Sequence, residues 1–255
     1  LDVGDSTDSG GKSNAPESYV KKCSFNYNYN SAVGLFGANN IPVEDNVIFT
    51  FINDGIKDEG ERNKITGNLV SKGLSVARML GQAQNPEWYG CINILRASDV
   101  LMTGNVAAGC ANAGFLTLGN DCEKPFQMGD NEAHSSQHGI SLYSRGLMRL
   151  ESGCGRVNNF FAWKNYDYAV HIYSENSYEF DNIRAVDNGV GILPWIVGPS
   201  AASHLSENKF VTVENSIIVG VSDVYDCAKE ARPDIYKSPM DMSRRWSGRG
   251  KRQQD

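Results

Sequence analysis

Long hydrophobic runs are missing from this chain of 255 residues. The longest, Val47 to Ile52 and Ile217 to Val221, fall far short of the ~20 apolar residues that a transmembrane helix needs, so the sequence predicts no membrane-spanning helix. No stretch has the length and apolar period of a long amphipathic helix. There is no initiator Met and no charged-then-apolar signal peptide, and we expect a processed piece or a fragment of a longer protein.

The fingerprints of several function classes are also missing. The sequence contains no G-x-S-x-G nucleophile motif, no P-loop and no dinucleotide-binding glycine motif. The net charge is -6, and no basic stripe runs through the body of the chain. Because phosphate recognition needs such a stripe, we expect no nucleic-acid partner.

Cysteine is present, but without the C-x-x-C spacing of zinc sites. The chain has six cysteines, at Cys23, Cys91, Cys110, Cys122, Cys154 and Cys227. An even number suits a secreted protein with disulfides. Only a short loop separates Cys110 from Cys122, and this pair is the candidate disulfide. The alternative is a set of independent buried thiols.

Histidines are few and do not form a metal motif. His134 and His138 lie four residues apart, a spacing that groups side chains on a helix but not on a strand. We therefore predict no metal and no cofactor, with calcium in an Asp- or Asn-rich loop as the alternative. His171 alternates with apolar neighbours and is expected to project outward.

What the chain does contain is a degenerate repeat. Short apolar stretches lead repeatedly to an asparagine and then to a second alternating stretch. The predicted corner positions are Asn46, Asn68, Asn105, Asn131, Asn159, Asn182 and Asn215. Their intervals suit one coil of a solenoid, or one coil plus an inserted loop. Asn tolerates the left-handed backbone conformation of a sharp corner, and stacked Asn side chains can form a hydrogen-bonded ladder.

A glycine follows most of these asparagines. Gly55, Gly114, Gly139 and Gly189 come at similar distances after the predicted corners, and glycine suits a second sharp turn. The pattern therefore predicts an all-β fold, a right-handed parallel β-helix of about seven to eight irregular rungs at one strand spacing each.

Composition divides the chain into three parts. Residues 1–17 are linker-like, residues 18–230 hold the predicted β-helix, and residues 231–255 form a basic C-terminal tail. Arg249, Lys251 and Arg252 in that tail match the Arg-x-Lys-Arg form cut by secretory convertases and are a candidate processing site. The alternative is an ordinary solvated tail.

Several motifs, in order, resemble the fibrocystin and fibrocystin-L family and, more distantly, the cell-surface hyaluronidases that share the G8 domain. They are Gly104 to Gly109, Asn131 to Ser136, Phe161 to Tyr168 and Ala185 to Ile192. The resemblance covers roughly residues 20 to 230. It implies a large ectodomain on the cell surface, on cilia or stereocilia among other sites, with a structural or receptor-like role.

Two functions of different classes follow. The first is a non-catalytic extracellular module whose partners are other extracellular proteins or neighbouring segments of the same large chain. The second is a carbohydrate-active β-helix, hyaluronidase-like or lyase-like, that acts on an extracellular polysaccharide. Asp181 and Asp187 flank one corner and are its acidic candidates, although a turn role for Asp187 is the more ordinary interpretation. No catalytic residue is predicted.

Aromatic residues suit either function, as a sugar platform or a protein hot spot, but core filling is the more ordinary use for most of them. The set comprises Trp88, Trp163, Trp195, Trp246, Tyr166, Tyr168, Tyr173 and Tyr178.

Overall fold

The computed structural model describes residues 2–3, 18–74, 89–125, 127–143, 150–196 and 208–222. Every regular element in these ranges is a β-strand. None of the described segments forms a helix that could cross a membrane. The strands belong to one compact unit, Leu1–Gly220. Residues 4–17, most of the predicted linker, and residues 223–255, with Cys227 and the candidate processing site, lie outside the described ranges.

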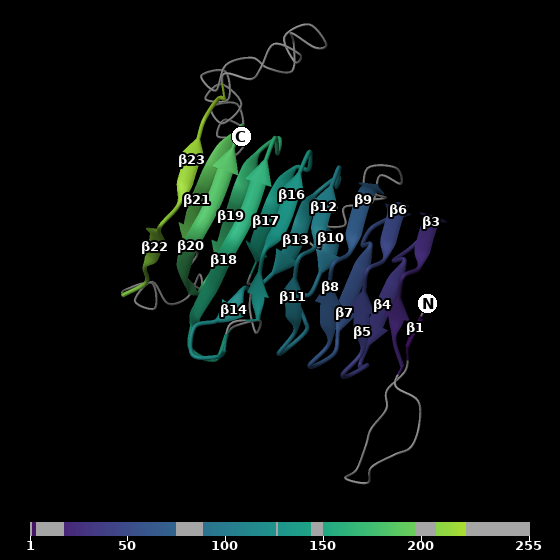
Figure 1. Cartoon of the computed structure of the whole chain (residues 1–255). Helices are drawn as coiled ribbons and strands as arrows, with labels where there is room; N and C mark the ends of the chain where they lie inside the picture. Colours follow the sequence, from purple (N-terminus) through teal and green to yellow (C-terminus); the bar gives the residue numbers. More distant parts are fainter. Residues whose placement is uncertain are drawn as a thin grey trace, which may run out of the picture. The chain divides into compact units, whose positions relative to one another are not determined.

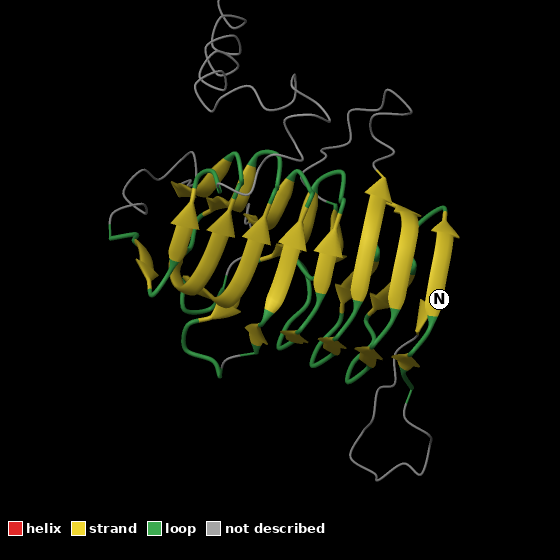
Figure 2. Ribbon diagram, turned by 45° about the horizontal axis from the view of Figure 1, so that its top comes forward, coloured by secondary structure: helices red, strands yellow, loops and turns green. Residues whose placement is uncertain are grey.

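The strands form three sheets through which the chain passes in turn (Figures 1 and 2). Sheet A contains β1 (Asp2–Val3), β4 (Val33–Phe36), β7 (Ile56–Glu59), β10 (Gly90–Asn93), β13 (Ala113–Thr117), β17 (His138–Tyr143), β19 (Tyr168–Ser174) and β21 (Val190–Ile196). Sheet B contains β2 (Val20–Lys21), β5 (Pro42–Glu44), β8 (Lys64–Thr66), β11 (Leu101–Thr103) and β15 (Met128–Gly129).

Sheet C is the largest. It contains β3 (Ser24–Asn28), β6 (Val47–Ile52), β9 (Leu69–Leu74), β12 (Val106–Ala108), β16 (Asn131–His134), β18 (Cys154–Trp163), β20 (Ser177–Val186), β22 (Val211–Glu214) and β23 (Ile217–Val219). Short β14 (Asn120–Asp121) pairs antiparallel with β18, while neighbouring strands along each sheet pair in parallel. The predicted all-β class with parallel pairing is confirmed, and the arrangement is consistent with a parallel β-helix.

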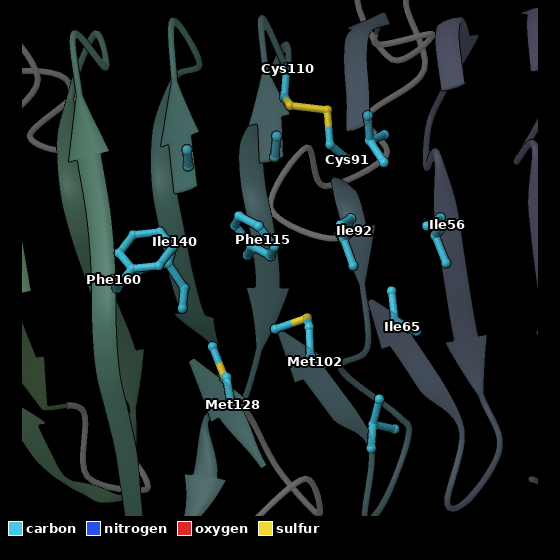
Figure 3. Packing of buried hydrophobic residues seen from close by; sticks show 14 of the residues in the cluster. Ile56, Ile65, Cys91, Ile92, Met102, Cys110, Phe115, Met128, Ile140 and Phe160 are labelled. Atoms are coloured by element: carbon cyan, nitrogen blue, oxygen red, sulfur yellow. A yellow bond between two sulfur atoms is a disulfide. The ribbon is translucent and has the colours of Figure 1, made fainter. Parts of the chain in front are cut away.

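The core consists of columns, because equivalent residues of successive coils stack in register. In sheet A, Ile56, Ile92, Phe115 and Ile140 come from successive strands and are fully buried (Figure 3). Alternation along each strand sends these side chains inward. In sheet C the inward column is Phe25, Ile48, Val70, Ala107, Ala133, Ala162, Ala185 and Ile218.

The corner between sheets B and C holds the predicted asparagine ladder. Asn46, Asn68, Asn105 and Asn131 are buried, and each Nδ2 donates to the Oδ1 of the next, at 2.9, 3.0 and 3.0 Å. The same oxygens accept backbone N–H groups from the preceding coil, at 3.1 Å from Asn46, for example. The ladder therefore satisfies polar groups that the sharp turn would otherwise bury without partners.

The later predicted corners occupy a different position. Asn131 pairs with Phe160, so Asn159 lies one residue before the ladder column. Asn159 belongs instead to a column of left-handed residues that precede the ladder position in each coil. This column is Lys22, Asp45, Gly67, Gly104, Asp130, Asn159, Asn182 and Asn215.

Asn182 and Asn215 are exposed, and Asn182 Nδ2 donates to Asn159 Oδ1 at 2.8 Å. Phe160 follows Asn159 and Ile183 follows Asn182 at the buried ladder position, so apolar contact replaces the polar ladder in these two coils.

The predicted second-corner glycines lie at the beginning of sheet A strands, but the reason is packing. Gly55, Gly114 and Gly139 do not adopt positive φ. A Cβ on Gly114 would lie 2.7 Å from Gly139 O and 2.9 Å from Ala133 Cβ. Only a hydrogen fits at such distances, so these glycines allow sheets A and C to approach each other closely.

The predicted Cys110–Cys122 bridge is wrong. Cys110 is bonded to Cys91, and Cys122 is bonded to Cys154 (Figure 3 shows the first). Cys91 and Cys110 lie about one coil apart along the chain, and residues so related lie close together in space. Cys23 is exposed and unpaired.

Candidate interaction surface

The outer face of sheet C is the candidate functional surface. Two outward columns cross it, because alternate residues of each strand point away from the core. The first column is Ser24, Val47, Leu69, Val106, Glu132, Phe161, Arg184 and Ile217. The second is Asn26, Phe49, Ser71, Ala108, His134, Trp163, Val186 and Val219.

Most of these outward side chains are apolar, which is unusual for a sheet face in contact with water. Val47, Phe49, Leu69 and Ile217 are 44, 41, 42 and 58% exposed. Val47 and Phe49 lie on β6 and Leu69 lies beside Val47 on β9, so these three form one apolar cluster. Glu132, His134 and Arg184 separate this cluster from Ile217 on β23. Contiguous exposed apolar surface of this kind marks binding surfaces.

Cationic side chains lie over the aromatic rings of this face. Lys72 Nζ is 5.3 Å from the centre of the Phe49 ring, and Lys164 Nζ is 5.6 Å from that of Trp163. Arg184 Cζ is 5.0 Å from the centre of the Phe161 ring. Each pair is attractive by roughly 0.5–1 kcal/mol at an exposed site. The rings are thereby held in place, with charged groups around their apolar surfaces.

Trp163 is the best-anchored residue of the face. Its ring stacks on the His134 ring at 4.2 Å, and its Nε1 donates to Glu132 Oε1 at 2.7 Å. Burial lowers the pKa of His134, against the opposing charge of Glu132, so the imidazole is neutral at neutral pH. A tryptophan fixed on both its face and its edge loses little freedom when a partner binds, which suits a hot spot.

The backbone behind this face is held by a second ladder, at the corner between sheets C and A. Ser136 N–H donates to Asn165 Oδ1 at 3.1 Å, and Asn165 Nδ2 donates to Asn188 Oδ1 at 2.9 Å. Asn165 and Asn188 were absent from the predicted corners, although their place just after a left-handed residue is the same as that of Asn46. Rigid support of this kind preorganises the outer face.

Sheet A carries a second group of polar and aromatic side chains on its outer side. The rings of His138 and His171 stack at 4.8 Å, and His138 also stacks on Tyr168 at 5.2 Å. Burial, reinforced by His171, lowers the pKa of His138 to about 3, and burial lowers that of His171 to about 4. His171 does project outward, as predicted, but it is half-buried. His134 lies in sheet C and His138 in sheet A.

The carboxyl groups with raised pKa lie inside the coils rather than in a groove. Burial raises the pKa of Asp54 to about 6 and that of Asp58 to about 6, against hydrogen bonds that lower both. Asp54 is 2% exposed and Asp58 is 1% exposed, so a polymer cannot reach them. Asp181 Oδ1 accepts a hydrogen bond from Asn215 Nδ2 at 2.7 Å, and Asp187 adopts a φ of 57°, which suits a turn residue.

The predicted aromatic set is scattered. Tyr178 is fully buried in the core, and Tyr166 is 49% exposed. Tyr173 of β19 stacks with Tyr143 of β17 on the outer side of sheet A. Trp88 and Trp246 lie outside the described ranges, as does the side chain of Trp195. Sequence reasoning included Trp163 but missed Phe49 and Phe161.

Comparison with known proteins gives one group of relatives. Fibrocystin-L of Homo sapiens is 33% identical over 221 residues, which are 83% of this chain and 5% of that protein. Fibrocystin-L of Mus musculus is 31% identical over 221 residues, again 83% of this chain and 5% of that protein. Fibrocystin of Canis lupus familiaris is 31% identical over 214 residues, 84% of this chain and 5% of that protein.

The chain thus spans only 5% of the length of these curated relatives. No protein-family model matches it. No solved structure matches it either.

Proposed function

Because the chain belongs to the fibrocystin family, we propose that it is a non-catalytic, receptor-like structural module of a large extracellular protein at the cell surface. It contacts other extracellular proteins, or neighbouring segments of the same large chain, through the outer face of sheet C. The observation that carries this proposal is the cluster of exposed apolar and aromatic side chains on that face, formed by Val47, Phe49 and Leu69.

The cysteines support an extracellular location. Cys91 is bridged to Cys110, and Cys122 is bridged to Cys154. Disulfides of this kind form in oxidising compartments, which include the secretory pathway and the cell surface.

We further infer that the coils form a right-handed parallel β-helix of about seven to eight rungs. The chain visits sheets B, C and A in a repeating order, with parallel pairing between equivalent strands. Parallel crossover connections are right-handed in ~98% of cases. The column of left-handed residues from Lys22 to Asn215 contributes one member to each coil, which supports the rung number.

The proposed contacts are testable with a photo-crosslinking amino acid placed at Phe49 in the protein displayed on cells. Phe49 lies on the proposed surface, whereas Tyr29 is 89% exposed but outside the strands of sheet C, and serves as the matched control. We expect specific crosslinks to extracellular proteins from position 49 and few from position 29. Equal crosslinking from both positions would contradict the assignment of this face.

The catalytic alternative is tested separately. Purified protein is incubated with hyaluronan and chondroitin, with and without divalent cations, and the polymer length is followed by gel electrophoresis. We expect unchanged polymer. Shortened chains that depend on an intact Asp181 would replace the structural role with a carbohydrate-active one.

A further inference from the structure

The C-terminal end of the stack exposes residues that belong to the core columns. Ala185 is 1% exposed, whereas Ile218, the next member of the same inward column, is 53% exposed. In the neighbouring column Phe180 is 1% exposed and the next member, Val213, is 43% exposed. These side chains belong to inward columns, so a further coil stacked on β22 and β23 would bury them.

Among the described residues, the first coil at the opposite end is also uncovered, and it is basic. Phe25 begins the inward column of sheet C and is only half-buried, while Ile48 behind it is fully buried. Lys21 and Lys22 are exposed on the first coil. An uncovered strand edge of this kind readily accepts another parallel strand.

The two ends are complementary in their strands. At the first end, sheet A extends by β1 beyond β4, with no described strand of sheet B or C beside β1. At the last end, sheet C extends by β22 and β23 beyond β20, while the described part of sheet A stops at β21. Stacking one copy on the next places β1 beside β21 and completes a single coil from two halves.

The charges of the two ends are complementary in the same register. Lys21 pairs with Glu44 in the next coil, with Nζ 2.9 Å from Oε2. Glu214 occupies the equivalent position at the other end, next to Asp181 of the preceding coil. If another copy continues the stack in this register, Glu214 meets Lys21 of that copy, and the acidic end faces the basic one.

We propose that this end of the stack is an interaction surface for a second copy of the chain, which docks head to tail through the edges of β22 and β23 against β2 and β3. Val213 and Ile218 become buried in the shared coil, and Glu214 pairs with Lys21 of the next copy. A head-to-tail contact without rotation does not close, so the product is an open-ended rod. This contact uses strand edges rather than the face of sheet C and is independent of the proposed function.

The first test compares two neighbouring residues of β23 that point to opposite sides. Ile218 belongs to the core column and is 53% exposed, whereas Ile217 points outward and is 58% exposed. Light scattering coupled to size exclusion measures the mass of the full chain across a wide concentration range. We expect the wild-type mass to rise with concentration beyond two copies, Ile218→Glu to remain monomeric, and Ile217→Glu to behave as the wild type.

The second test exchanges the charges. Glu214→Lys and Lys21→Glu should each fail to assemble alone, because like charges meet at every contact. Mixing the two variants restores opposite charges at every contact and should restore assembly. Circular dichroism and urea unfolding establish that each variant is folded before its mass is interpreted.

Four outcomes would overturn the proposal. A wild-type chain that stays monomeric at all concentrations shows that the ends do not bind each other. A mass that stops at two copies indicates a closed dimer instead. Equal loss of assembly in Ile217→Glu and Ile218→Glu indicates association through the face of sheet C. Failure of the mixed charge variants to assemble would exclude the proposed register.

Discussion

The buried asparagine ladder predicts that equivalent-looking corner residues differ greatly in their contribution to stability. Asn105 lies in the middle of the ladder. Its Oδ1 accepts from Asn68 N–H at 3.0 Å, and its Nδ2 donates to Ile65 O at 2.8 Å and to Asn131 Oδ1 at 3.0 Å. The change Asn105→Ala removes these bonds together.

The magnitude follows from the groups that lose partners. Asn68 Nδ2 keeps its bond to Val43 O, and Asn131 Oδ1 keeps its bond from Asn105 N–H. The Asn68 N–H loses its acceptor, Asn105 Oδ1, and the Ile65 carbonyl loses its donor, Asn105 Nδ2. Each buried orphan costs about 1–3 kcal/mol, so we expect Asn105→Ala to lower the free energy of unfolding by roughly 3–5 kcal/mol with the cavity included.

The matched control is Asn182→Gly. Asn182 is exposed, its side chain donates one bond to Asn159 Oδ1, and its φ of 53° is one that glycine adopts freely. We expect a loss of about 1 kcal/mol or less. Urea unfolding followed by circular dichroism measures both. Equal losses in the two variants, or a loss below about 1 kcal/mol for Asn105→Ala, would refute the reasoning.

Two further predictions concern the interior. The pKa of Asp58 is raised from 3.8 to about 6, so the folded form holds its proton more strongly, and stability is lost as pH rises from about 4 to about 6. Asp58→Asn keeps the acceptor for Gly60 N–H, so its free energy of unfolding, measured by urea titration, should equal that of the wild type near pH 4 and exceed it by up to about 3 kcal/mol near pH 7. If the two proteins differed more in free energy of unfolding at pH 4 than at pH 7, the raised pKa of Asp58 could not be the cause. Replacing Cys91 and Cys110 together by Ala should lower stability by about 3 kcal/mol, measured in the same way under oxidising conditions, and an unchanged midpoint would show that the bridge adds nothing.

Part of the asparagine ladder can be predicted from the sequence, because the ladder needs a specific side chain. Only a buried amide both donates to and accepts from its copies above and below, so Asn46, Asn68, Asn105 and Asn131 are recognisable. Asn159 has the same residue type for another reason, which is tolerance of positive φ. One residue type thus serves two adjacent positions, and spacing alone cannot separate them.

The disulfides and the apolar face were not predictable from local spacing. A short loop between two cysteines favours bridging in many folds, but in a solenoid proximity recurs once per coil. Strand alternation alone would place Phe49 and Phe51 on the same face. Thr50 adopts a φ of 56°, and the chain turns there, so Phe51 is buried and Phe49 is exposed. The left-handed residue at this second corner shifts the alternation.

Column and depth in the stack, rather than residue type, decide what a side chain contributes to this protein. Ile48 and Ile218 occupy the same inward column, yet the first is fully buried and the second is mostly exposed, because only one of them has a coil on each side. In a stack held together by contacts between adjacent coils, an end coil has half the neighbours of an inner one. The free energy still available from burying its apolar side chains is what makes an open end the natural place for association.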